Sequence, residues 1–438
     1  MKRSVENDIL EWKKSTRRKP LIIRGARQVG KTWLVENVLA KEFDSFVSID
    51  LEKRRDLHAL FEGSLDPKAL VEGLEIIDGR IVPGKTLLFI DEVQACPRAL
   101  MSLRYFYEQM PELHMVAAGS LLEFIFSEIS FPVGRIQHLD MHPMTFFEYL
   151  LALNKKTMAE KSLKRPEKIT VAVQQTIMDE LRKYFFVGGM PESVKAYRDT
   201  GSMVESFDVQ SEILDSYRAD FSKYKPGIDT TCLDTVFQNV ARSVGEQLKY
   251  TRLNEHFSYQ TNHKAFDLLV KARLISKIQS CNPSGLPLGA SVNPRRFKAA
   301  LLDIGLMQQL CQIPAELAVK QENLLNIYQG RLAEQFVAQE LCAGQNRELF
   351  YWSREARGSS AEVDFVVVNK GKIFPVEVKS GAAGRMKSIH SMLDRYDNCT
   401  RGLVLYDGTY QDVPEQKLTF LPLYCAAAIT GDALKINE

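Results

Sequence analysis

The stretch Gly25-Ala26-Arg27-Gln28-Val29-Gly30-Lys31-Thr32 decides the fold of the N-terminal part of this chain. It matches the phosphate-binding loop pattern G-x-x-x-x-G-K-S/T at every position. The glycines let the backbone bend so that successive N–H groups can point at phosphate oxygens. We expect all eight residues to bind a nucleoside triphosphate, with the Lys31 ammonium at its β- and γ-phosphates and the Thr32 hydroxyl on Mg²⁺.

The residues on either side of this loop supply a strand and a helix. Pro20-Leu21-Ile22-Ile23-Arg24 is a short apolar run with β-branched residues, and apolar residues recur at helical spacing from Lys31 to Ala40. Strand, glycine-rich loop and helix in this order form the setting in which the pattern binds phosphate. The alternative is a plain turn between a strand and a helix that binds nothing.

A second motif, Leu87-Leu88-Phe89-Ile90-Asp91-Glu92, supplies the acidic partner of the loop. Its four consecutive apolar residues are typical of a strand buried on both faces of a parallel sheet. We expect Asp91 to hold the Mg²⁺ ion and Glu92 to orient or activate the attacking water. A solvated strand end is the alternative reading of these two carboxylates.

The composition describes an ordinary globular protein. The chain has 438 residues, 45% of them hydrophobic and 26% charged, with a formal net charge of +2, which indicates about two to four domains. It has no apolar run near the ~20 residues that span a bilayer, and its first residues lack the apolar core of a signal peptide. The seven cysteines stand singly, which argues against a zinc knuckle and predicts reduced thiols in a cytoplasm.

The order of the helix and strand patterns predicts an α/β protein of several domains. Alternating signals up to about residue 150 are typical of a parallel sheet. Helical periodicity follows, with Gly188-Gly189 ending one helix and Pro191 starting the next, which suggests a helical lid. Three helical patterns before a strand at Leu274–Ile278 suggest a winged helix, or a three-helix packing module without a nucleic-acid role. The predicted domains are 1–144 (parallel sheet), 145–210 (helical lid), 211–295 (winged-helix-like) and 296–438 (a further α/β domain).

A second constellation of charged residues lies near the C-terminus. Residues 361–379 read as a β-hairpin with a tight turn at Lys370-Gly371. A two-residue turn there pairs Asp364 with Glu377, and Lys379 lies on the same face of its strand as Glu377. Two carboxylates and an ammonium therefore converge.

A further carboxylate, Glu334, lies on a predicted helix from Arg331 to Leu341, while Pro375 predicts an edge strand or a bulge. Carboxylates bind Mg²⁺ or Mn²⁺, and a nearby lysine can steady charge on a phosphoryl oxygen. The order of an acidic residue (Glu334), an aspartate (Asp364) and a Glu-x-Lys motif (Glu377 to Lys379) resembles the motif of the restriction-endonuclease-like nucleases. In this chain Glu-Val-Asp stands in place of the Pro-Asp with which that motif more commonly starts. The predicted metal site comprises Glu334, Asp364, Glu377 and Lys379. A salt bridge on a solvated hairpin and an inert nuclease fold are the alternatives.

Four stretches together carry a resemblance that covers nearly the whole chain: Ile22 to Thr32, Phe89 to Gln94, Gly188 to Glu192 and Val376 to Gly381. In these stretches the chain resembles the AAA-type P-loop ATPases of bacteria and archaea that carry an uncharacterised C-terminal domain of restriction-endonuclease-like fold. The resemblance implies ATP and Mg²⁺ as ligands.

The same resemblance implies roles for two further residues. Ser120, at the end of the strand His114–Gly119, looks like the polar sensor of the γ-phosphate, and Arg135 looks like the arginine that reads the nucleotide. Arg135 would act in its own subunit or in that of a neighbour, and the second case requires a homo-oligomer. A strand-end serine and a surface arginine are the ordinary alternatives.

Three functional hypotheses follow. In the first, the protein is a cytoplasmic Mg²⁺-dependent ATPase that acts as a nucleotide-driven switch on a partner such as DNA, with Lys31, Glu92 and Arg135 as catalytic residues. In the second, the ATPase gates a metal-dependent DNA nuclease in the C-terminal part. In the third, an inert nuclease fold only binds DNA or a protein.

Overall fold

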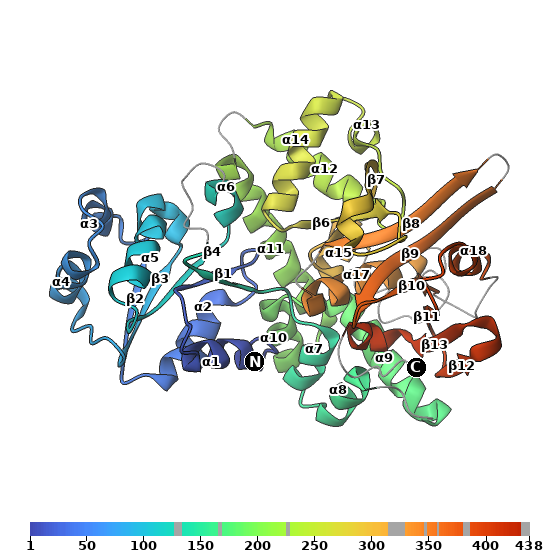
Figure 1. The fold of residues 1–438 in the computed structure, drawn as a ribbon, viewed down its shortest axis with the longest axis horizontal. Coiled ribbons are helices and arrows are strands. Elements are labelled where there is room, and N and C mark those ends of the chain that lie inside the picture. Colours follow the sequence, from blue (N-terminus) through green and yellow to red (C-terminus); the bar gives the residue numbers. More distant parts are fainter. Residues whose placement is uncertain are drawn as a thin grey trace. The chain divides into compact units, whose positions relative to one another are not determined.

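The computed structural model describes residues 1–126, 134–164, 169–224, 228–313, 329–345, 348–356, 359–379 and 386–430. The chain forms two compact units, Lys2–His142 and Pro143–Glu438, with Met1 assigned to the second (Figure 1). They are named the N-terminal unit and the C-terminal unit below.

The N-terminal unit is built on a parallel five-stranded sheet with the strand order β2-β3-β4-β1-β5. The α/β architecture expected for this part is confirmed, and every residue of β3 and β4 is buried, as a strand covered on both faces requires. The strands are β1 (Leu21–Arg24), β2 (Ser45–Asp50), β3 (Thr86–Asp91), β4 (His114–Gly119) and β5 (Gln137–Asp140).

Helices lie on both sides of this sheet (Figure 1). One face shares an apolar core with α3 (His58–Glu62), α4 (Pro67–Asp78) and α5 (Pro97–Gln109). Proline begins both α4 and α5, at the position where its missing N–H costs no hydrogen bond. The remaining elements are α1 (Glu6–Lys14), α2 (Lys31–Leu34), its π-helical continuation η1 (Val35–Leu39), η2 (Ala40–Glu42), η3 (Arg55–Leu57), η4 (Val93–Ala95) and α6 (Leu122–Phe126).

The C-terminal unit contains a mixed eight-stranded sheet with the order β12-β13-β11-β10-β9-β8-β6-β7. Parallel pairs join β10 to β11, β11 to β13 and β6 to β8, and the other neighbours are antiparallel. The strands are β6 (Ile275–Cys281), β7 (Val292–Leu301), β8 (Leu349–Ala356), β9 (Ser359–Asn369), β10 (Lys372–Val378), β11 (Gly402–Tyr406), β12 (Gln411–Val413) and β13 (Leu418–Pro422).

Helices make up the rest of the described C-terminal unit. Many begin at a side-chain cap, such as Thr145 and Glu148, which form a reciprocal capping box at the start of α7. The elements are α7 (Phe146–Ala152), α8 (Lys156–Leu163), α9 (Val171–Val187), α10 (Pro191–Thr200), α11 (Met203–Tyr224), α12 (Thr230–Arg242), α13 (Tyr250–Leu253), α14 (Tyr259–Lys271), η5 (Leu288–Ser291), α15 (Ile304–Leu310), α17 (Gln329–Gln345), α18 (Lys387–Arg395), η6 (Pro414–Gln416) and η7 (Leu423–Ile429).

The helices predicted to form a lid are instead built into the C-terminal unit. The Phe146 N–H, at the start of α7, donates to Glu340 on α17 at 2.8 Å. The Gln339 side chain on α17 donates to the Tyr184 hydroxyl on α9 at 2.8 Å, and α8 and α9 both pack against η7. These buried polar contacts join helices that are far apart in the sequence, and the lid at 145–210 stays a prediction.

The three helices and the hairpin expected for a winged helix are present, and whether they form a separate domain stays a prediction. Three helices, α12 to α14, precede the hairpin of β6 and β7, and the strand expected at Leu274–Ile278 is β6. This hairpin extends the eight-stranded sheet through the parallel pairing of Ile278 with Leu349. The boundary predicted at 295/296 therefore falls inside β7.

The Gly-Gly pair acts as predicted, because α9 ends at Val187 and α10 begins at Pro191. Gly188 has φ +69°, and a Cβ there would lie 2.3 Å from a carboxylate oxygen of Asp303. The Gly189 N–H donates to Asp303 at 2.6 Å, and a Cβ on Gly189 would lie 2.1 Å from the Met144 carbonyl. Both glycines are thus required by close packing around a buried aspartate.

The expectation that Pro375 marks an edge strand or a bulge is wrong. β10 lies between β9 and β11, and its register with β9 runs without a shift from Lys372 to Val376. The pairing with β11 begins only at Val376, one residue after the proline. The missing N–H of Pro375 therefore leaves no gap in the recorded pairing with β11.

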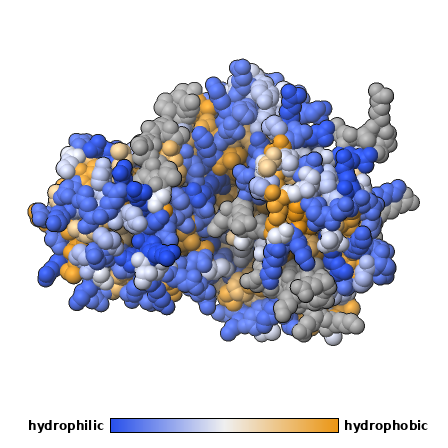
Figure 2. Space-filling model, in the orientation of Figure 1, coloured by the Kyte–Doolittle hydropathy of each residue, from blue (hydrophilic) through white to orange (hydrophobic). Residues whose placement is uncertain are grey.

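Hydrophilic surface covers most of the face drawn in Figure 2. Among the described residues, none of the helices combines the length and the apolar character needed to cross a membrane.

The buried Glu340 should make the stability of the C-terminal unit depend on pH. Its side chain is 1% exposed, and burial, together with the charge of Glu148, raises its pKa from 4.5 to about 8. The folded state disfavours the ionised form, so the stability is fully present below pH 4.5 and is lost as the pH rises toward 8.

Glu340→Gln removes the charge and keeps an acceptor for the Phe146 N–H. We expect its free energy of unfolding near pH 8 to exceed that of the parent by roughly 2–4 kcal/mol, with a gain that shrinks severalfold toward about pH 5. Urea titrations across this range measure the difference, with Glu212→Gln at an exposed position of α11 as the control. A gain that does not vary with pH would contradict the assignment.

Candidate functional site

The phosphate-loop stretch lies between the end of β1 and the start of α2, as predicted. Gly25 has φ +155°, and a Cβ at this position would lie only 2.4 Å from the backbone carbonyl oxygen of Met141. Gln28 and Gly30 both have positive φ, at 63° and 98°, and Gly30 is the residue that caps α2. Left-handed backbone at these positions bends the loop around the N-terminus of the helix.

Two cationic side chains bind the backbone carbonyls of the loop. The Lys31 ammonium is buried and donates to the carbonyl oxygens of Gly25 at 3.0 Å and Ala26 at 2.8 Å. The Arg3 guanidinium is also buried and donates to the Val29 carbonyl at 2.8 Å. Sequence reasoning missed Arg3, because a lone arginine near the N-terminus gives no signal of its contact with the loop.

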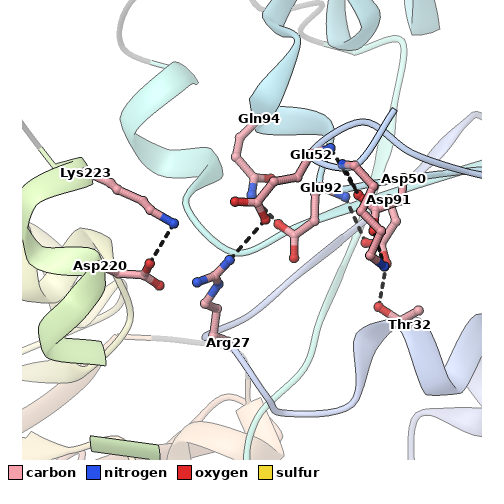
Figure 3. A network of polar contacts seen from close by, with 10 residues as sticks. Arg27, Thr32, Asp50, Glu52, Asp91, Glu92, Gln94, Asp220 and Lys223 are labelled. Atoms are coloured by element: carbon pink, nitrogen blue, oxygen red, sulfur yellow. Dashed lines mark hydrogen bonds and ion pairs between the residues drawn. The ribbon is translucent and has the colours of Figure 1, made fainter. Parts of the chain in front are cut away.

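The loop meets the acidic end of β3 through a direct contact. The Thr32 hydroxyl donates to one carboxylate oxygen of Asp91 at 2.5 Å, and the other oxygen of Asp91 accepts from the Glu92 N–H at 2.9 Å (Figure 3). A hydroxyl and a carboxylate in contact are oxygen donors of the kind that Mg²⁺ takes. Thr32 and Asp91, predicted from two separate motifs, therefore fit a magnesium ion beside the loop.

Glu92 is held by a partner that the sequence analysis did not assign. Its backbone has φ +46°, and its carboxylate accepts a short hydrogen bond from the Gln94 side-chain amide (Figure 3). Burial raises the pKa of Glu92, and the hydrogen bond from Gln94 opposes this shift, as do the charges of Lys31 and Arg27. The Gln94 side-chain oxygen is buried and has no hydrogen-bond partner among the described residues.

Arg27, at the third position of the loop, forms an ion pair with Glu52 at 3.2 Å (Figure 3). Glu52 follows the end of β2, and no motif in the sequence pointed to it. Charged residues at this edge of the sheet therefore come from the segments that follow three strands: β1, β2 and β3.

Ser120 directly follows β4, whose last residue Gly119 pairs with Arg24 at the end of β1. Its hydroxyl is buried and makes no hydrogen bond to any described residue. The structure therefore places this serine at the same edge of the sheet as the phosphate loop.

Arg135 lies at the opposite edge of the sheet. Arg135 precedes β5, which runs parallel to β1 with Leu21 opposite Gln137. Arg135 therefore lies at the edge where the strands begin, whereas the phosphate loop follows the end of β1. Its guanidinium forms an ion pair with Glu108 on α5 at 3.1 Å. The structure does not bring Arg135 to the phosphate loop of its own chain. This position disagrees with contact to the nucleotide of the same subunit and agrees with contact to the nucleotide of a neighbouring subunit.

The second predicted site, in the C-terminal unit, contains a residue that was not foreseen. The Lys298 ammonium on β7 lies 2.5 Å from Glu362, 3.4 Å from Glu334 and 3.7 Å from Asp364. Its side chain is only 1% exposed. A signal was present in the sequence, since Lys298 interrupts an otherwise apolar run at 297–301.

The hairpin that carries the other predicted residues has the expected register. Val376 pairs with Phe365, so Glu377 follows in register with Asp364. Glu377 accepts a hydrogen bond from the Lys379 ammonium at 2.6 Å, and Asp364 accepts from the Val378 N–H at 2.8 Å.

These residues do not fit a divalent metal ion as they are placed. The carboxylates of Glu334 and Asp364 both face Lys298, whose ammonium lies where a shared cation would be bound. Within the described parts of the chain, no three His, Cys, Asp or Glu side chains form a group suited to a metal. The predicted metal set of Glu334, Asp364, Glu377 and Lys379 thus stays a prediction: contacts link its residues, but the Lys298 ammonium lies among them.

Comparison with solved structures gives weak likenesses. A Walker-type ATPase of Pyrococcus abyssi is 16% identical over 71% of this chain and 95% of its own, with a TM-score of 0.45. The RuvB Holliday junction branch migration motor of Thermotoga maritima is 15% identical over 62% and 88%, with a TM-score of 0.29. These scores are too low to support a conclusion about this chain, and no curated protein matches it.

Family models match three consecutive parts of the chain. Residues 17–150 match the model of an AAA domain, and this range contains the phosphate loop and the acidic end of β3. Residues 178–317 and 329–426 match models of two domains of unknown function, DUF8612 and DUF4143. The chain carries a P-loop ATPase domain of the AAA type, followed by two domains whose function is unknown.

Proposed function

We propose that this protein is a Mg²⁺-dependent ATPase that acts as a nucleotide-driven switch. The observation that carries the proposal is the contact between the Thr32 hydroxyl and the Asp91 carboxylate, beside the buried ammonium of Lys31. Loop and carboxylate come from motifs 59 residues apart and meet at one edge of the sheet. This combination supplies the amides, the cation and the oxygen ligands that a triphosphate with Mg²⁺ needs.

The Lys31 ammonium can bind two kinds of acceptor. In the structure it donates to the Gly25 and Ala26 carbonyls. Phosphate oxygens carry full negative charge and form stronger, charge-assisted hydrogen bonds than neutral carbonyls do. Binding of ATP therefore draws the ammonium away from the loop backbone, while Thr32 and Asp91 would hold the Mg²⁺ that offsets the phosphate charge.

Glu92 is proposed to accept the proton of the attacking water. Burial raises the pKa of Glu92, which makes its carboxylate a stronger base, and the hydrogen bond from Gln94 fixes one carboxylate oxygen and partly offsets this rise. The buried Ser120 hydroxyl, which makes no hydrogen bond within the described chain, is proposed to bind the γ-phosphate. Arg135 would serve the nucleotide of a neighbouring copy, which requires a homo-oligomer.

The acidic cluster of the C-terminal unit gives no support to an ATP-gated nuclease. Its carboxylates face a lysine, and a metal-dependent nuclease needs them for its cation. We therefore propose ATP hydrolysis as the activity of the chain and binding, of DNA or of a protein, as the task of the C-terminal unit.

Lys31→Ala removes the ammonium from the loop, and Glu92→Gln removes only the charge of the proposed base. We expect Lys31→Ala to weaken ATP binding by roughly 100-fold or more, since a charge-assisted contact to phosphate is lost. Glu92→Gln should retain binding and lower turnover by roughly 100-fold. Titration calorimetry and phosphate release measure the two effects, with the exposed Lys68→Ala and Glu72→Gln as matched controls. Turnover at the parent rate in Glu92→Gln would disprove the role of Glu92.

Gly25→Ala tests whether the bend of the loop is required. The added methyl group would meet the Met141 carbonyl at 2.4 Å, and backbone atoms cannot yield as a flexible side chain can. We expect loss of nucleotide binding and a destabilisation of the N-terminal unit of about 1–3 kcal/mol. Gly63→Ala is the matched control, because a Cβ there meets nothing within 4 Å. Equal ATP affinity in the Gly25→Ala and Gly63→Ala variants would show that the bend is dispensable.

A further inference from the structure

We propose that Lys298 is the permanent cation of the carboxylate cluster in the C-terminal unit, in place of a divalent metal ion. In this proposal the cluster formed by Glu334, Glu362, Asp364 and Glu377 binds Mn²⁺ or Mg²⁺ only when the Lys298 ammonium is removed. The inference concerns the C-terminal unit alone and is independent of the ATPase.

The burial of Lys298 is the first observation that supports this role. A lysine with 1% of its side chain exposed loses nearly all hydration of its charge, which is tolerated only when partners replace the water. Three carboxylates within 4 Å, from Glu334, Glu362 and Asp364, provide that replacement. The Tyr351 ring lies 5.4 Å from the ammonium and adds a cation–π contact.

The backbone around the cluster fixes the ammonium in this place. Lys298 pairs with Ile278 in the β6–β7 hairpin, and Glu362 and Asp364 are two residues apart on β9, so they share one face of the sheet. The Gln335 side chain on α17 bonds both the N–H and the carbonyl of Leu301, each at 2.9 Å, and so ties the helix of Glu334 to the strand of Lys298.

The turn at Gly245 lies against the cluster. Gly245 has φ +84°, and a Cβ at this position would lie 2.9 Å from a carboxylate oxygen of Glu334. The backbone of this turn is thus close to Glu334, whose carboxylate also lies 3.4 Å from the Lys298 ammonium.

The distances show that the ammonium and a metal ion exclude one another. A divalent ion would need carboxylate oxygens at about 2.0–2.6 Å from its centre, and Lys298 already contacts oxygens of Glu362, Glu334 and Asp364 at 2.5 to 3.7 Å. An ion among these oxygens would overlap the ammonium or repel its charge.

Two ammonium groups of the chain already face the carboxylates of the cluster. Lys298 contacts Glu334, Glu362 and Asp364, and Lys379 donates to Glu377 at 2.6 Å. A divalent cation would therefore have to compete with cations that the chain itself supplies.

Binding of Mn²⁺ to the full-length chain without nucleotide tests the proposal. Free Mn²⁺ is measured by electron paramagnetic resonance in the parent, Lys298→Gln, and the double variant Lys298→Gln with Asp364→Asn. We expect Lys298→Gln to bind one Mn²⁺ per chain more than the parent, and the double variant to lose this ion. Mn²⁺ should also raise the melting temperature of Lys298→Gln and not that of the control Lys372→Gln, an exposed lysine on β10.

If Lys298→Gln fails to fold, a comparison of the parent with the Asp364→Asn variant decides the question. Equal Mn²⁺ binding by the parent and Asp364→Asn supports the proposal, because the carboxylate is then not a metal ligand while Lys298 is present. Mn²⁺ binding, or DNA cleavage in Mn²⁺, that the parent shows and Asp364→Asn lacks would overturn it. A folded Lys298→Gln that binds no additional Mn²⁺ would overturn it as well.

Discussion

The bend of the chain at Gly25 is the constraint on which the N-terminal unit depends. Only a residue without a side chain can approach the Met141 carbonyl this closely, and this approach holds the loop between the ends of β1 and β5. The bend then places Thr32 against Asp91 at the end of β3. One steric requirement thus brings together a backbone cradle, a buried ammonium and an oxygen-ligand pair, none of which would meet in a straighter loop.

The N-terminal sheet could be predicted because its strands are continuous apolar runs, which a parallel sheet covered on both faces demands. The contacts of its loops could not be predicted. Gln94 and Glu52 lie in segments without periodicity, and their contacts with Glu92 and Arg27 depend on the three-dimensional course of the chain. The position of Arg135 follows from its place before a strand that runs parallel to β1, because strands of a parallel sheet begin at the edge opposite the phosphate loop.

In the C-terminal unit, local register was predictable and long-range packing was not. The two-residue turn after Asn369 fixes the hairpin, and its register, observed from Lys372 to Val376, is the one that was predicted. The pairing of Ile278 with Leu349 joins segments 71 residues apart and turns the expected wing into part of the main sheet. The contact of the helices expected as a lid with the buried Glu340 could not be predicted for the same reason, since Glu340 lies far along the chain.

The two acidic sites of the protein differ in what balances their charge. At the end of β3, Asp91 accepts a hydrogen bond from a hydroxyl, a neutral group that brings no cation of its own. In the C-terminal cluster, Asp364 and its neighbours face Lys298, which supplies a cation from the chain itself. Similar residue types in a sequence can therefore lie beside a neutral hydroxyl at one place and beside a buried ammonium at the other, and our proposals for the two sites follow from this difference.

A crystal structure with Mg²⁺ and a non-hydrolysable ATP analogue tests the central claim most directly. The account predicts that the Lys31 ammonium leaves the Gly25 and Ala26 carbonyls for phosphate oxygens, and that Thr32 and Asp91 lie on either side of the Mg²⁺ ion. A loop without nucleotide at saturating concentration, with Lys31 still bonded to both carbonyls, would contradict it.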